Sequence, residues 1–553
     1  MNSKKISTVN RSVSAILEDI NSGKFAIPRL QREFVWDGPR VAKLIDSIYK
    51  GMPIGAVLVW ETAKANKLYL REKYHVLPPF NDRNKKVWFL IDGQQRLSAL
   101  HCISKGEIVE NSKGKKINFK HIVFSLSGKK NDQRFFYRKA VPGQYISVKQ
   151  ILDNSQCNHL GLNKSHLAVI REVRKNILDY KALMVRAHMK IDEVRECFLR
   201  INTQGMKVTT ADAIFSKAEA LDLRDFAHEV RQYLGTTFQR IEDMPILWTL
   251  VALEGESSPG RNYVERAIRK IEKEAIQNKS LKKKIGVRWR YLKQCFGKSV
   301  DYLKENFNVI STEYLYSPYM ISMLALFYYY NRKGPDQKQK VEIRKWFWAT
   351  TVASRYSGRN FYKCLKADVA FFERLAKNKN ARFKTEELAH AYDIRKTSYD
   401  STSSGIGSAF YCLLFQKKPA NLLDDGLNII PLAQFTTAIN KKNRHHIFPR
   451  SLMTHNKVNH SDYNSLCNIC LLTVEENTQI GNNKPSDYLK ESRKKTVLFA
   501  KKMGHHLIPY DDKSGLWEKN IKKGFHQFVR QRQELIIRTM EQGAGIRLFR
   551  NDR

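Results

Sequence analysis

The sequence predicts an α+β protein that is mostly helical and is divided into several domains. A strand, a polar turn and a helix follow one another at residues 87–103. Between about 220 and 435 the apolar residues recur mainly at helical spacing. At 443–484 two adjacent histidines stand beside a short apolar run and a proline, and two Asn-containing segments follow. A chain of 553 residues has room for about two to four domains.

The N-terminal part combines helices with strands. Residues 11–22 have the apolar spacing of an amphipathic helix. Val87–Ile91 is strand-like, Asp92-Gly93 ends it, and Gln95-Arg96 open a helix that continues to Ile103. Other predicted elements are a helix around 41–48, a turn and buried strand at 51–61, a strand pair near 117–126 and 135–137, and helices from about 165.

The rest of the chain is predicted to be mainly helical. Residues 317–333 form an apolar helix that is flanked by charge and best explained as core. The Ser/Gly-rich stretch at 401–410 is a turn or hinge candidate, and helices are expected after Lys484 and at 525–540. The predicted domains are 1–220, a helical middle region at 221–435, and 436–553.

The charge of the chain points to a polyanionic partner. The net charge is +43, from 97 basic and 54 acidic residues, so nucleic acid is the simplest partner. Residues 261–300 carry 13 Lys and Arg against 3 Glu, and Trp289 and Tyr291 lie among them. Arg288 and Arg290 are therefore candidates for DNA contact. A solvated helix face explains this segment equally well.

Membrane and secretory classes are not favoured. No apolar run reaches the ~18 residues that a spanning helix needs, and the N-terminus lacks the apolar core of a signal peptide. The eight cysteines are scattered, which fits reduced thiols and a cytoplasmic location. Cys467 and Cys470 form a lone C-x-x-C, which we interpret as packing residues because a structural zinc site needs a second pair.

One segment near the C-terminus has the parts of a one-metal phosphodiesterase. It reads N-R-H-H-I-F-P-R, followed by N-S-L-C-N-I-C-L and V-E-E-N. One imidazole takes a proton from water, while a neighbouring and a later side chain hold a divalent cation. Adjacent strand residues face opposite sides, so His445 and His446 take different tasks only where the strand ends or bends. Pro449 favours such a place. The alternative is a pair of surface histidines.

The D-G-Q-Q-R turn is a second candidate site. A strand that enters a helix through a Gly turn presents N–H groups to an anion. Arg96 can contact phosphate, and Asp92 can hold a cation or a ribose hydroxyl. An ordinary capped turn is the alternative, and for Gln31 and Arg32 the alternative is a buried hydrogen-bond network joining two elements.

The C-terminal block resembles the HNH, or ββα-metal, endonuclease motif, in the variant of GmrSD-like, modification-dependent (type IV) restriction enzymes. The resemblance implies that His446 is the general base and that His445 and Asn477 bind the metal. It implies that Asn468 pins the ββα loop and orients the base. An amide ligand suits Mg²⁺ or Mn²⁺ better than tight zinc binding. The flanking phosphates would contact Arg444, Arg450 and Lys484.

The N-terminal motifs resemble the ParB/sulfiredoxin-like domain of the same family. I-P-R-L-Q-R-E-F-V-W-D, I-D-G-Q-Q-R and I-N-T-Q-G carry this likeness. In the family, DGQQR is tied to binding and hydrolysis of a nucleoside triphosphate. The resemblance therefore implies a nucleotide site made by Gln31, Arg32, Asp92, Gly93, Gln94, Gln95, Arg96 and Asn202.

Together these motifs predict a nucleotide-regulated endonuclease that senses DNA modification and defends against phage. The expected partners are DNA, a nucleotide, and a second copy or a defence-operon protein, without a membrane. Two alternatives stay open. One is a nucleotide-gated DNA-binding factor with a degenerate nuclease domain, and the other is an RNA-directed nuclease or toxin.

Overall fold

The computed structural model describes most of the chain: residues 6–28, 31–63, 70–71, 75–111, 115–127, 132–153, 162–203, 210–215, 218, 221–256, 258–378, 380–384, 387–436, 444–494 and 496–550. It divides into two compact units. The first contains residues 1–228 and 268–283, and the second contains 229–267 and 284–553.

A five-stranded mixed sheet forms the centre of the first unit, with the strand order β1-β10-β3-β4-β2. β10 pairs antiparallel with β1 and parallel with β3, while β4 pairs antiparallel with β3 and parallel with β2. The strand bounds are β1 Ile6–Ser12, β2 Phe25–Ala26, β3 Val57–Ala63, β4 Lys86–Asp92 and β10 Lys181–Ala187. β1 was not predicted, since most of its side chains are partly or fully exposed and it lacks a clear apolar alternation.

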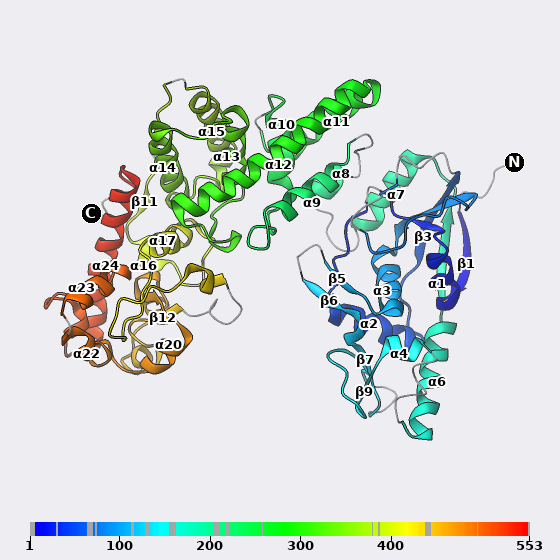
Figure 1. The fold of residues 1–553 in the computed structure, drawn as a ribbon, viewed down its shortest axis with the longest axis horizontal. Helices are drawn as coiled ribbons and strands as arrows, with labels where there is room; N and C mark the ends of the chain where they lie inside the picture. The colour runs from blue at the N-terminus through cyan, green and yellow to red at the C-terminus, as the bar shows by residue number, and fades with distance from the viewer. Residues whose placement is uncertain are drawn as a thin grey trace. The chain divides into compact units, whose positions relative to one another are not determined.

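Helices cover both faces of this sheet (Figure 1). One core joins the sheet to helices that contribute Ile16, Ile45 and Leu100, and the other joins it to Val194 and Phe198. The helices of the first core are α1 Val13–Asn21, α2 Gly38–Tyr49, α3 Gln94–Lys105, α4 Val148–Leu152 and α6 Lys164–Asp179, and that of the second is α7 Ile191–Thr203. These elements confirm the predicted helices near 11–22 and 41–48 and the buried strand at 51–61.

Smaller elements complete the first unit. β7 pairs antiparallel with β8, which confirms the predicted strand pair. β9 pairs antiparallel with the other edge of β7. The remaining bounds are β5 Ile108–Glu110, β6 Lys116–Asn118, β7 Ile122–Ser125, β8 Phe135–Tyr137, β9 Tyr145–Ser147, α8 Thr210–Phe215 and α9 Leu223–Tyr233.

The returning segment 268–283 is an integral part of the first unit. Glu272 lies in α11 (Arg261–Gln277) and is only 4% exposed. Its carboxylate accepts a hydrogen bond from the Leu221 backbone N–H at 2.9 Å. A buried carboxylate needs such partners, so this contact ties the segment to the main part of the unit.

The second unit is mainly helical up to residue 416. Its helices there are α10 Asp243–Ala252, α12 Lys279–Phe307, which begins in the first unit, α13 Tyr319–Tyr330, α14 Gln337–Val352, α15 Phe361–Ala376, α16 Asp393–Lys396 and α17 Gly405–Gln416. α13 is buried almost throughout, which confirms the core interpretation of 317–333. No helix in the described ranges is long and apolar enough to span a membrane.

The prediction of a turn or hinge at 401–410 is wrong for its second half, where α17 begins. Ser404 caps the helix by accepting from the Gly407 N–H. A Cβ at Gly407 would lie 1.9 Å from the Ser401 carbonyl oxygen. The glycines therefore permit a tight helix start rather than a hinge.

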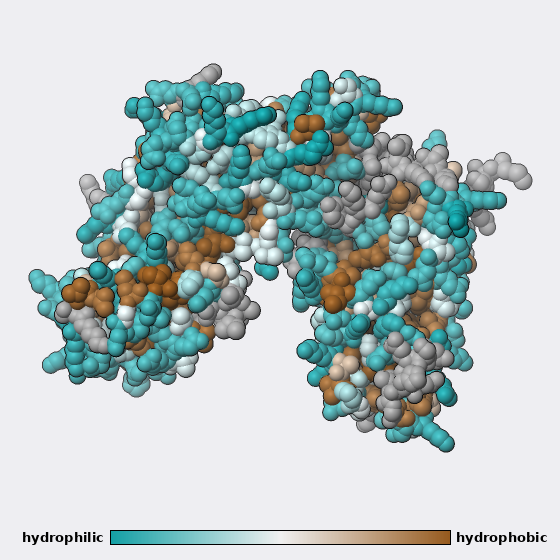
Figure 2. Space-filling model, in the orientation of Figure 1, coloured by the Kyte–Doolittle hydropathy of each residue, from teal (hydrophilic) through white to brown (hydrophobic). Residues whose placement is uncertain are grey.

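After residue 443 the second unit adds short strands and further helices. Their bounds are β12 Arg444–His446, α18 Arg450–His455, α19 His460–Tyr463, β13 Ile469–Leu471, α20 Val474–Ile480, α21 Pro485–Tyr488, α22 Lys490–Lys494, α23 Thr496–His505, α24 Ile521–Ala544 and β14 Phe549–Arg550. β14 pairs in parallel with an earlier strand, β11 Ala389–His390. α21 and α24 confirm the helices predicted after Lys484 and at 525–540. Hydrophilic side chains dominate the visible face of each unit, as the charged composition leads one to expect (Figure 2).

Candidate active site

A small ββα arrangement presents the C-terminal histidine pair. β12 and β13 are antiparallel, with His445 opposite Cys470 and His446 opposite Ile469. α20 follows β13 and is capped by Thr473, whose side chain accepts from the Glu476 N–H. The two histidines are the last residues of β12, so the strand ends where their tasks must diverge.

His445 lies directly against Asn477 of α20. Its Nδ1 is 2.6 Å from the Asn477 Oδ1. The side chain is 4% exposed, and burial lowers the pKa of His445 to about 4, so the ring is neutral at pH 7. Within the described residues its Nε2 is buried and has no hydrogen-bond partner.

His446 contacts a residue that the sequence did not single out. Its Nε2 lies 2.9 Å from the Oδ1 of Asn464, which directly follows α19. The ring also meets the edge of Tyr399, with 5.1 Å between centroids. Burial lowers the pKa of His446 to about 4, against the opposing effect of the Asn464 hydrogen bond. The neutral ring is thus able to accept a proton at pH 7.

Asn468 holds the main chain of the loop. Its Oδ1 accepts from the Phe448 N–H at 2.9 Å, and its Nδ2 donates to the carbonyls of Phe448 and Tyr463 at 3.0 and 2.9 Å. These contacts fit the expected loop-pinning task. The side chain that hydrogen-bonds to the His446 ring is Asn464 and not Asn468, so any effect of Asn468 on the ring passes through the loop.

The predicted phosphate contacts differ in exposure. Arg444 is directed inward: it donates to the Tyr399 carbonyl, pairs with Glu313 at 3.2 Å and lies over the Tyr411 ring. Arg450 is exposed at the start of α18, and Lys484 is exposed and 3.6 Å from Asp487. On α12, Arg290 is exposed and Arg288 pairs with Glu254.

Other histidines and cysteines in this region serve the core. Cys467 and Cys470 are fully buried, and burial raises the pKa of each thiol to about 12, so both stay protonated. The ring of His505 contacts the Lys417 carbonyl, and that of His506 contacts the Ala420 carbonyl at 2.6 Å. In the part of the chain that is described, no cluster of three His, Cys, Asp or Glu side chains could hold a metal.

The D-G-Q-Q-R turn opens onto a cavity of about 340 Å³ in the first unit. Gly93 joins β4 to α3 with a φ of 94°, a left-handed conformation that favours glycine. The cavity brings together seven predicted nucleotide-site residues: Gln31, Arg32, Asp92, Gly93, Gln94, Gln95 and Arg96. Trp36, Arg40 and Ile201 complete the lining, while the side chain of Asn202 lies outside the described residues.

Three glutamines build the wall of this cavity. Gln31 donates to the carbonyls of Leu90 and Ile91 at 3.0 and 2.6 Å. Gln94 donates to the Arg32 carbonyl at 2.9 Å, and Gln95 donates to the Glu33 carbonyl at 3.0 Å. Gln31 therefore belongs to a buried network joining two elements, as the structural alternative predicted.

Arg96 is also part of the wall. It donates to the Ile54 and Ala56 carbonyls at 2.7 and 2.9 Å and pairs with Asp92 at 2.9 Å. A Cβ at Gly55 would lie 2.7 Å from its Nη1, so a glycine is needed there. Because both terminal nitrogens are engaged, Arg96 supports the turn in this conformation rather than presenting the predicted bidentate phosphate contact.

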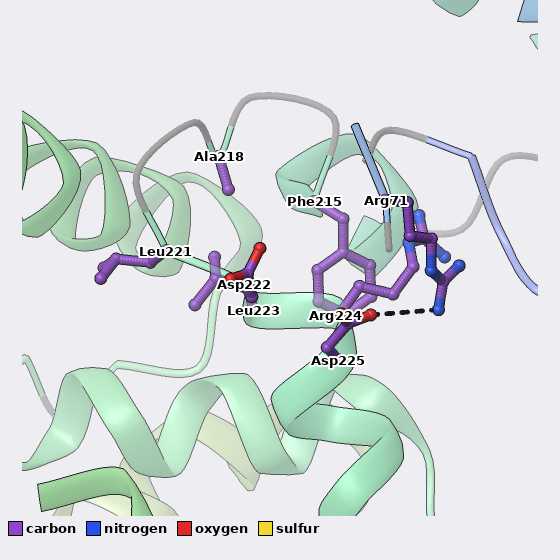
Figure 3. A pocket seen from close by; sticks show the side chains of 8 residues that line it. All are labelled: Arg71, Phe215, Ala218, Leu221, Asp222, Leu223, Arg224 and Asp225. Atoms are coloured by element: carbon purple, nitrogen blue, oxygen red, sulfur yellow. Dashed lines mark ion pairs between the residues drawn. The ribbon is translucent and has the colours of Figure 1, made fainter. Parts of the chain in front are cut away.

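Ionic contacts brace the loop that carries Gln31 and Arg32. Arg71 is 2% exposed, donates to the Gln31 carbonyl at 3.1 Å and lies 3.6 Å from Glu33. It also pairs with Asp225 at 3.2 Å, beside a small cavity that Phe215 and Arg224 help to line (Figure 3). His228 reaches Glu33 at 2.8 Å. These contacts hold the loop in place, and with it the wall of the cavity.

Two comparisons relate the sequence of this chain to known proteins. Residues 13–219 match the family model described as the GmrSD restriction endonuclease, N-terminal domain. The match supports the predicted GmrSD-like relationship and suggests a function of the restriction-endonuclease type, with DNA as substrate. The chain is also similar to the uncharacterized protein MJ0686 of Methanocaldococcus jannaschii, at 22% identity over 603 residues. That alignment covers 96% of this chain and 98% of MJ0686, so it spans nearly the whole length of both proteins.

Proposed function

We propose that this chain is a metal-dependent DNA endonuclease with an HNH-type active site, regulated by a nucleotide and acting in defence against phage. The observation that supports the proposal most is the contact between His445 Nδ1 and Asn477 Oδ1 at 2.6 Å. The two residues belong to a ββα arrangement, and His446 directly follows His445. In this proposal the N-terminal GmrSD-like part, with a ParB/sulfiredoxin-like fold, senses nucleotide and DNA modification.

The residues present fit a hard or borderline divalent cation. His445 offers a neutral imidazole whose Nδ1 lies 2.6 Å from the amide oxygen of Asn477. A cation held by both atoms would take the place of the hydrogen bond between them, and the ring proton would then lie on Nε2, which has no hydrogen-bond partner among the described residues. The amide oxygen suits Mg²⁺ or Mn²⁺, and phosphate oxygens of the substrate would supply the negative charge that neither residue carries. A bound cation supplies Lewis-acid stabilisation of the phosphodiester and of the departing oxygen.

His446 performs the proton transfer in this proposal. Its ring is unprotonated at pH 7, so it can take a proton from the attacking water. Asn468 fixes the loop that follows His446, so that the His446 ring and the phosphate meet in one geometry. Arg450 and Lys484, which are exposed, are the better candidates for phosphate contact, since Arg444 is engaged inside the protein.

Cleavage should depend on the cation. We expect the full chain to nick or cut phage DNA in Mg²⁺ or Mn²⁺, and EDTA should abolish the activity until cation is restored. Gel assays should compare unmodified and modified phage genomes and tRNA, with each triphosphate and without. Cleavage that persists in EDTA contradicts metal dependence, and cleavage of tRNA alone favours the RNA-directed alternative.

The same proposal assigns the D-G-Q-Q-R cavity to a nucleoside triphosphate. Arg32 and Arg40 supply positive charge, and the α3 N-terminus supplies backbone N–H groups for phosphates. Trp36 adds an aromatic face, with the Arg40 guanidinium 6.0 Å from its ring centre. Gln94 Oε1 is a buried acceptor that has no partner within the described ranges, and a ligand N–H can satisfy it.

Arg40→Ala should weaken triphosphate binding about tenfold, because a charged phosphate contact contributes roughly 1.5–3 kcal/mol, part of which water replaces. Isothermal titration with each triphosphate measures this. Arg83→Ala removes an exposed arginine of the same unit and should leave the affinity unchanged. Equal affinity of Arg40→Ala and the unmodified protein would contradict the assignment.

A further inference from the structure

The buried contact between His446 and Asn464 determines which ring nitrogen faces the reaction. A side-chain amide oxygen can only accept a hydrogen bond. The ring nitrogen that lies 2.9 Å from Asn464 Oδ1 is Nε2, so Nε2 carries the proton of the neutral ring. The lone pair that can accept a proton then belongs to Nδ1.

A second histidine lies on the other side of the Asn464 amide. The Asn464 Nδ2 lies 2.9 Å from the Nε2 of His460, and in this arrangement the amide donates to an unprotonated His460 Nε2 while its oxygen faces His446. With the amide reversed, Nδ2 would face His446, and Nε2 would become the acceptor. His460 lies one helical turn before Asn464, and the Asn464 N–H bonds to the His460 carbonyl at 3.2 Å.

The backbone around Asn464 is anchored as well. The Asn464 carbonyl accepts from the Tyr399 N–H at 2.9 Å, and the Tyr399 ring packs against His446. Asn464 is 5% exposed and His446 is 9% exposed, so water competes little for these bonds. Ring, amide and backbone therefore form one rigid assembly.

We infer that Asn464 is a positioning residue that holds His446 in the Nε2–H tautomer with Nδ1 as the proton-accepting atom. The inference deepens the proposed nuclease function and rests on it for its catalytic consequence. The tautomer itself is a property of the protein without substrate, and it can be measured whether or not DNA is cleaved.

Three variants of the full chain test this role. Asn464→Leu removes the acceptor at similar volume, Asn464→Asp keeps an acceptor oxygen, and Asn483→Leu is an exposed control. Long-range ¹⁵N–¹H spectra of histidine-labelled protein, with His446→Gln to assign the signal, report the tautomer. Cleavage kinetics report kcat and KM separately.

We expect the Nε2–H tautomer in the unmodified protein and in Asn464→Asp, and its loss in Asn464→Leu. The leucine variant should lose about 100-fold in kcat with little change in KM, because the base is displaced and DNA binding is not. Asn464→Asp should recover most of the rate. An Nδ1–H tautomer in the unmodified protein, or an unchanged tautomer in Asn464→Leu, would overturn the inference. If the leucine variant does not fold, the spectra of the unmodified protein and Asn464→Asp decide. If no DNA is cleaved, the nuclease proposal fails while the tautomer still decides this inference.

Discussion

His446→Ala is expected to reduce DNA cleavage at least about 1000-fold, within the range that a general base contributes. No other described side chain is seen to replace it, because His445 is turned toward Asn477 and its Nδ1 is engaged there. Supercoiled plasmid in Mn²⁺ gives the most sensitive measurement, since a single nick changes its mobility.

The alanine variant also leaves the Asn464 amide oxygen without its donor, which costs about 1–3 kcal/mol of stability. His446→Gln restores an N–H donor and separates lost chemistry from lost stability. His455→Ala removes an exposed histidine of the neighbouring helix α18 and should cleave normally. If His446→Ala retains more than a tenth of the rate, His446 is not the general base.

Arg532→Met is expected to destabilise the second unit by about 3–5 kcal/mol. The Arg532 guanidinium is fully buried in α24 and donates to the carbonyls of Cys467, Ile469, His506 and Leu507 at 2.7–2.9 Å. Burial lowers the pKa of Arg532 to about 10, so it remains charged at pH 7. Methionine fills part of the space and leaves all four carbonyls without this donor.

Urea unfolding monitored by tryptophan fluorescence measures the loss. Arg532→Lys keeps the charge but lacks the planar guanidinium, so its stability should lie between that of Arg532→Met and that of the unmodified protein. Arg530→Met, on an exposed position of the same helix, should unfold like the unmodified protein. Two of the carbonyls flank Asn468, so cleavage should fall with stability in Arg532→Met. Unchanged stability would contradict the assigned role.

Local pattern was sufficient to predict the elements on which both sites are built. The apolar run before Asp92-Gly93 predicted β4 and α3, because a glycine with positive φ is the simplest way to join them. The resemblance of the C-terminal block to the HNH motif implied that His445 and Asn477 serve one site, and the structure brings them into contact. The assigned chemistry of these residues stays a prediction.

Long-range partners explain what the sequence did not predict. Arg444 looked like a phosphate contact because it flanks the histidines, but Glu313 and Tyr411 engage it from distant parts of the chain. Asn464 escaped notice because only the folded loop after α19 brings it to His446. Trp36 lies in a quoted motif and Arg40 lies three residues beyond it in α2, yet their place on the cavity depends on how α2 packs.

The return of residues 268–283 to the first unit has a practical consequence for protein engineering. A recombinant fragment that stops at His228 would omit Glu272 and leave the Leu221 N–H without its acceptor. Expressing the first unit alone therefore requires joining residues 268–283 to it through a linker. Simple truncations that aggregate would report a missing piece of the core rather than a failure of the proposed function.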